Sequence, residues 1–150
     1  MFARLVVTAM ILLGLSVPSL AQEPTPTKEP VLTKVPVFTE LPGYGKKCWI
    51  GEDFYFTYKF DKKPKMGTAI LKVQLFNKSG TRTTSLAIIG ISDMPAMKGA
   101  HDSGEVPFKL NKKGDYLLPV NVAMPGEWEV KLIFMNDKEV VFRGRFAFKV

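Results

Sequence analysis

FYFTYKF, residues 54–60, alternates the apolar set Phe54, Phe56, Tyr58 and Phe60 with Tyr55, Thr57 and Lys59. A period of two sends successive side chains to opposite faces, which indicates a β-strand and not a helix. The same alternation recurs over residues 69–75, 106–110, 116–122, 128–134 and 140–148. In residues 83–91 apolar residues occur at both odd and even positions, which predicts a strand whose two faces are both covered. About seven short strands separated by turn residues predict an all-β, immunoglobulin-like two-sheet sandwich.

The N-terminal part of the chain has a different composition. Residues 1–21 combine one early positive charge, an apolar run and small residues at Ser19 and Ala21, the pattern of a signal peptide cleaved before Gln22. Residues 22–46 contain five prolines and predict an extended spacer, in which residues 31–38 are also compatible with an edge strand. We therefore expect a signal peptide (1–21), a spacer (22–46) and a sandwich domain (47–150). The expected location is the periplasm or the exterior, with no membrane span after cleavage.

Composition excludes several classes of function. The 150 residues include one Cys and one His, which excludes a disulfide scaffold, a zinc ribbon and any site that needs two of either residue. We predict no enzymatic activity and no catalytic residues. The chain has 21 Lys and Arg against 14 Asp and Glu, for a net charge of +7. Because no basic–aromatic pattern of an RNA-binding sheet is evident, we expect no nucleic-acid partner and a solvated basic surface.

One loop has a composition that favours metal chemistry. Residues 93–104 lack alternation and contain Met94, Met97 and His101, while Met124-Pro125-Gly126 is expected to close a hairpin leading into Trp128. Thioether sulfur is a soft, neutral ligand that selects copper(I), and imidazole suits either oxidation state of copper. The predicted copper(I) ligands are Met94, Met97, His101 and Met124. Either Asp93 or Asp102 is expected to orient the imidazole.

These motifs also carry a family resemblance. The run Met94-Pro95-x-Met97…His101, then Gly114-x-Tyr116, then Met124-Pro125-Gly126-x-Trp128 resembles the YtkA-like family of exported immunoglobulin-like domains, which is similar to FixH and copper-resistance sandwich proteins. The resemblance covers residues 67–150. It implies an envelope domain concerned with copper or heavy-metal handling, or with assembly of redox complexes, and therefore an envelope protein as partner.

Alternatives remain open for these residues. Met124 follows the even-numbered residues of 116–122 that are expected to face the core, so it is also expected to face the core. Met94 and Met97 are equally suited to filling the open end of the sandwich. The second functional hypothesis is accordingly a metal-free accessory domain that docks on a larger envelope assembly. Cys48 follows two lysines, which would favour its thiolate, but a lone Cys in an exported chain is as readily buried or paired with another chain.

Overall fold

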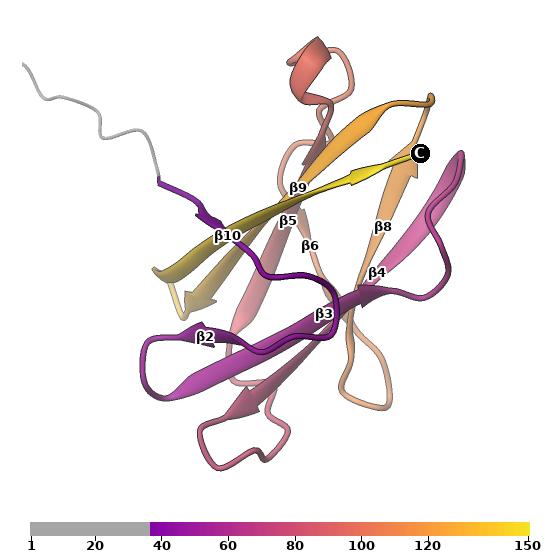
Figure 1. The fold of residues 1–150 in the computed structure, drawn as a ribbon. Helices are drawn as coiled ribbons and strands as arrows, with labels where there is room; N and C mark the ends of the chain where they lie inside the picture. The colour runs from indigo at the N-terminus through magenta and orange to yellow at the C-terminus, as the bar shows by residue number, and fades with distance from the viewer. Residues whose placement is uncertain (1–36) are drawn as a thin grey trace, which may run out of the picture. The chain divides into compact units, whose positions relative to one another are not determined.

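The computed structural model describes residues 37–150, which form ten β-strands and one short helix (Figure 1). The predicted signal peptide and residues 22–36 of the predicted spacer lie outside this range. The strands are β1 (Thr39–Glu40), β2 (Cys48–Ile50), β3 (Phe54–Phe60), β4 (Gly67–Asn77), β5 (Ala87–Asp93), β6 (Val106–Pro107), β7 (Lys109–Leu110), β8 (Tyr116–Val122), β9 (Glu127–Asn136) and β10 (Glu139–Lys149). The helix, η1, is a 3₁₀ turn at Pro95–Met97. Within the described residues, no helix has the length and hydropathy needed to cross a membrane.

The strands form two sheets of five. Sheet 1 has the order β1-β10-β9-β5-β6, and sheet 2 has the order β2-β3-β4-β8-β7. All neighbouring strands are antiparallel except β1, which pairs with β10 in parallel. The predicted all-β two-sheet sandwich is confirmed. Its core lies between the sheets, where the inward positions of the alternating segments are buried, including Phe56, Leu71, Val120, Trp128 and Phe134.

Two connections differ from the predictions. The residues between β8 and β9 do not form a hairpin, because β8 pairs with β4 and β7 in sheet 2 whereas β9 pairs with β10 and β5 in sheet 1. Residues 123–126 are therefore a turn from one sheet to the other. The expected strand over residues 106–110 is divided, since β6 joins sheet 1 and β7 joins sheet 2. Phe108, between them, donates its backbone N–H to the carbonyl oxygen of Ile88 at 2.9 Å. This segment thus closes one side of the sandwich.

Strand β5 also differs from its predicted environment. Its burial alternates, because Ile88 is buried whereas Ile89 and Ile91 are only half-buried. The inward glycine Gly90 lies so close to Leu118 that an added Cβ would be 2.4 Å from a Leu118 methyl carbon. The prediction of a strand covered on both faces is therefore wrong. The outer face of β5 is partly open to solvent.

The described end of the predicted spacer contacts the sandwich. Thr39 and Glu40 pair with Gly144 and Arg145 of β10, and the backbone N–H of Leu41 donates to the carbonyl of Arg145 at 2.8 Å. The Tyr58 hydroxyl donates to the carbonyl oxygen of Pro42 at 2.6 Å. The edge strand forms at Thr39–Glu40, just after the residues 31–38 proposed for it; residues 37 and 38 are not in a strand, and residues 31–36 lie outside the described range. Residues 39–46 belong structurally with the domain.

Candidate functional site

The candidate metal-binding loop lies at the end of the sandwich where β5 ends. Its base is fixed by two hydrogen bonds, from the Ser103 backbone N–H to the Ser92 carbonyl and from the Ser92 N–H to the Ser103 hydroxyl oxygen, each 2.9 Å long. The 123–126 turn lies at the same end of the molecule (Figure 1). The loop (residues 93–104) and the turn (residues 123–126) together are called the loop–turn end.

Met94 and Met97 differ in exposure although they are close in sequence. Met94 is 4% exposed and belongs to the hydrophobic core, whereas Met97 on η1 is 43% exposed. The Met97 backbone N–H donates to the Met94 carbonyl at 2.9 Å, which defines the 3₁₀ turn. The Met94 methyl carbon lies against Gly126, since a Cβ added there would be 2.9 Å from it. The loop and the inter-sheet turn are therefore in contact at Met94.

His101 contacts the strand that follows the turn. Its ring lies 6.0 Å from that of Trp128, centroid to centroid, at a tilt of 44°. Trp128 is fully buried and donates its indole N–H to the Met124 carbonyl at 3.1 Å. Beside these rings is a cavity of about 200 Å³, lined by Ser92, His101, Asp102, Ser103, Asn121, Ala123 and Trp128. Met124 itself is half-buried against the core.

The four predicted ligands are thus grouped at one end, but in different environments. Met94 is a core residue and Met97 faces solvent. His101 and Met124 are half-buried, and both contact Trp128, His101 through its ring and Met124 through its backbone carbonyl. Among residues 37–150 there is no group of three or more His, Cys, Asp or Glu side chains arranged to hold a metal ion. A metal at the loop–turn end would be held by thioether sulfur and one imidazole.

Neither Asp93 nor Asp102 accepts a hydrogen bond from the His101 imidazole, so the prediction that one of them orients the ring is wrong. Asp93 is buried and its carboxylate accepts the backbone N–H of Met94 at 2.7 Å. Asp102 accepts the backbone N–H of Gly104, also at 2.7 Å. Both carboxylates therefore stabilise the bends of the loop. The contact between Trp128 and His101 had no signal in the spacing of the sequence.

Cys48 is a buried core residue. Its thiol donates weakly to the Lys46 carbonyl at 3.6 Å, and burial raises its pKa to about 11. The neighbouring lysines do not offset burial, and Lys47 instead places its ammonium 4.6 Å from the centre of the Tyr55 ring. The expectation that these lysines favour the thiolate is therefore wrong.

Alkylation of Cys48 by iodoacetamide at pH 8 is expected to be at least about 100-fold slower in the folded protein than in urea. A thiol with a pKa near 11 is about one-thousandth thiolate at that pH, compared with about a quarter for an ordinary thiol. Intact mass measured over time gives both rates, and Cys48→Ala defines the background. Folded and unfolded rates within tenfold of each other would contradict the burial.

No protein-family model, curated protein or solved structure matches this chain. The family resemblance drawn from the sequence motifs therefore remains a prediction.

Proposed function

We propose that this protein is an exported, non-enzymatic copper(I)-binding protein that holds the ion at the loop–turn end and passes it to an envelope partner. The observation that carries the proposal is that the loop contacts the turn at Met94 with Gly126 and contacts the start of β9 at His101 with Trp128. These contacts hold the loop that carries Met94, Met97 and His101 against the turn that carries Met124. Export is supported by the N-terminal pattern of residues 1–21.

The environments of the four residues suit different parts in binding. Neutral thioethers need no deprotonation and carry no charge to desolvate, so Met94 and Met124 can contribute sulfur from buried or half-buried positions. Met97, 43% exposed, is placed to capture the ion from solvent or release it to a partner. His101 borders the cavity of about 200 Å³ and would supply the nitrogen ligand.

The test is a copper(I) titration of residues 22–150 against a coloured chelator under reducing conditions. The site variant carries Met94→Leu, Met97→Leu, Met124→Leu and His101→Gln. Leucine removes the sulfur but preserves the volume of the buried Met94, and such volume-conserving changes cost less than about 1.5 kcal/mol. The matched control carries Met135→Leu, because Met135 pairs with Ala87 at the start of β5 and so lies away from the loop–turn end.

Parent and control are expected to bind one copper(I) per chain. Removal of a residue that only supports a metal ligand costs roughly 10–100-fold in metal affinity. The site variant removes the ligands themselves, so its affinity for copper(I) is expected to fall by more than that. Circular dichroism during thermal unfolding establishes that all three proteins are folded. Equal affinities in parent and site variant would overturn the proposal.

That outcome would favour the metal-free alternative, in which the same residues only pack. The burial of Met94 is the observation that supports it, because a 4% exposed side chain against Gly126 already has a structural role. The protein would then be an accessory domain that docks on an envelope assembly through another surface.

A further inference from the structure

The outer face of sheet 2, which points away from sheet 1, carries a row of lysines that the strand register brings together. Lys59 of β3 is directly opposite Lys72 of β4, Lys72 is opposite Leu117 of β8, and Leu117 is opposite Lys109 of β7. The row crosses three inter-strand spacings of about 4.8 Å each, or about 14 Å in all. Like charges placed directly opposite each other destabilise a sheet. The Lys59–Lys72 pair therefore has a cost that a bound anion would remove.

The two outer faces of the sandwich differ in how their charges are matched. On sheet 1, Arg145 forms ion pairs with Glu40 and Glu129, and Lys131 pairs with Glu129 at 3.2 Å. On sheet 2, no described carboxylate lies within 4.0 Å of the ammonium groups of Lys59, Lys72, Lys109, Lys112 or Lys113. Lys72 is attracted to Asp115 at longer range, but these five lysines form no ion pair among the described residues and are available to an external anion.

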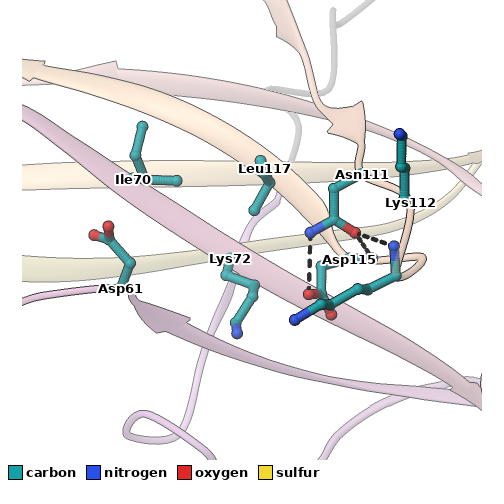
Figure 2. Close-up of a pocket in the computed structure, with 8 residues that line it drawn as sticks. Asp61, Ile70, Lys72, Asn111, Lys112, Asp115 and Leu117 are labelled. Carbon is teal, nitrogen blue, oxygen red and sulfur yellow. Dashed lines mark hydrogen bonds between the residues drawn. The ribbon is translucent and has the colours of Figure 1, made fainter.

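Lys59, Lys72, Lys112 and Lys113 line two open depressions of this face, and Lys109 lies beside them on β7. A depression of about 610 Å³ is lined by Asp61, Ile70, Lys72, Asn111, Lys112, Lys113, Asp115 and Leu117 (Figure 2). A smaller one of about 110 Å³, lined by Gly45, Thr57, Tyr58, Lys59, Lys72 and Gln74, adjoins it at Lys72. The half-buried Ile70 and Leu117 provide apolar surface between the charges. We call the two depressions together the lysine groove.

The carboxylates in the lysine groove leave most of its positive charge uncompensated. Asp115 is 5% exposed and already accepts hydrogen bonds from Arg82, Gln74 and Asn111. Asp61 is exposed and lies on the opposite side of Lys72 from Lys112 (Figure 2). The four lysines that line the groove, Lys59, Lys72, Lys112 and Lys113, therefore outnumber its two carboxylates.

We propose that the lysine groove binds an acidic polysaccharide, with lysines contacting its carboxylates and Ile70 and Leu117 contacting its sugar rings. Charge complementarity requires an anionic chain, and the hollow shape and apolar floor suit a narrow polymer. Single-stranded nucleic acid stacks on successive exposed aromatic rings. On this face the rings of Tyr55 and Phe76 stack on each other and are covered by Lys47 and Arg82. Of the three neighbouring rings Trp49, Tyr55 and Phe76, only Trp49 is therefore exposed.

An anionic bilayer fits the groove less well. Interfacial binding depends on apolar side chains that project into the lipid. Ile70 and Leu117 instead lie half-buried at the floor of the groove, between the charged residues. A polysaccharide chain can enter such a depression, whereas a flat membrane surface reaches only its rim.

The test measures binding of polygalacturonate fragments to residues 22–150, which contain both sheets, by calorimetry at about 50 mM salt. The groove variant carries Lys59→Gln, Lys72→Gln and Lys109→Gln. The matched control, Lys62→Gln, Lys63→Gln and Lys65→Gln, removes the same charge from the β3–β4 turn. We expect the groove variant to bind at least tenfold more weakly than the parent and the control to change less than threefold. Dextran, which is neutral, is expected not to bind.

Loss of affinity in the groove variant cannot be a folding defect if its melting temperature is unchanged or higher, as removal of the Lys59–Lys72 repulsion predicts. Equal losses in both variants would overturn the proposal, since binding would then follow net charge alone. Tighter binding to poly-dT or to phosphatidylglycerol vesicles than to polygalacturonate, at equal anionic charge, would also overturn it. The proposal is independent of copper binding at the loop–turn end.

Discussion

Replacing Trp128 with alanine is expected to lower the free energy of unfolding by about 3–5 kcal/mol. The indole is fully buried in the core and its N–H bonds to the Met124 carbonyl. Its removal leaves a cavity that neighbouring strands fill only in part, and it leaves a carbonyl without its donor. Urea unfolding followed by far-UV circular dichroism measures the change.

The chain offers a matched control in its other tryptophan. Trp49 lies on the outer face of sheet 2, is 50% exposed and contacts Tyr55 at a ring distance of 5.1 Å. Trp49→Ala is expected to cost less than about 1 kcal/mol, as for other surface positions. Trp128→Phe keeps an aromatic ring in the core but removes the indole N–H, and should fall between the two. Similar losses for Trp49→Ala and Trp128→Ala would contradict this account of the core.

Trp128→Ala also tests the construction of the candidate site. The same indole contacts His101 and fixes the turn that carries Met124. In the copper(I) titration, Trp128→Ala is therefore expected to weaken binding although no ligand is changed. Undiminished affinity in a folded Trp128→Ala protein would show that this contact does not organise the site.

Replacing Asp115 with asparagine is expected to destabilise the protein by about 2–3 kcal/mol at pH 7. The carboxylate is 5% exposed and accepts hydrogen bonds from the guanidinium of Arg82 at 2.8 Å, from Gln74 at 2.7 Å and from Asn111 at 3.2 Å. Burial alone would raise the pKa of Asp115, but these hydrogen bonds outweigh it and the pKa is lowered. Asparagine keeps the shape, removes the charge and turns an N–H₂ group toward other donors.

The lowered pKa fixes the sign of the pH dependence. A carboxyl group that ionises more readily in the folded state stabilises the protein fully above its unfolded pKa of about 3.9, and this contribution is lost as the pH falls through the folded-state value. The difference between parent and Asp115→Asn should therefore be constant from pH 7 to about pH 5 and shrink below about pH 4. Urea midpoints across this range measure it.

A second aspartate provides the control for this experiment. Asp53 pairs with Lys78 at 3.6 Å, but both side chains are more than 70% exposed. Such surface pairs contribute little to stability. Asp53→Asn is expected to leave the urea midpoint nearly unchanged at every pH. A pH-independent cost of Asp115→Asn would contradict the role assigned to its charge.

Alternation in the sequence located the long strands well. The segment at residues 54–60 coincides with β3, and those at 116–122 and 128–134 lie within β8 and β9. Alternation reports which side chains face the core but not which strand is the neighbour. For that reason a short link between two alternating segments indicated a hairpin, whereas residues 123–126 cross between sheets.

Departures from regular pairing were beyond this kind of prediction. Residues 106–110 keep one alternating pattern through a change of sheet, although only Val106 and Phe108 pack against the core and Leu110 is exposed. Ile89 and Ile91 indicated two-sided burial, but apolar residues also occur on partly solvated faces. Hydrophobicity alone did not distinguish these cases.

The candidate site was predictable in composition but not in arrangement. A loop has no parity, so nothing in the sequence distinguished the buried Met94 from the exposed Met97. Lys59, Lys72 and Lys109 are separated by 13 and 37 residues, and each alone indicated only a solvated position. Their juxtaposition depends on the register of four strands, which no local pattern specifies.

Strand β10 bears on the order in which the protein folds. It is the last strand along the chain, yet it pairs with β9 and β1 and brings Phe146 and Phe148 into the core. Sheet 1 therefore remains incomplete during synthesis until residues 139–149 have been added. The pairing of β10 with β1 joins Gly144 to Thr39, and such long-range pairing slows folding. The apolar strands of the nascent chain therefore stay accessible to chaperones until β10 has been made.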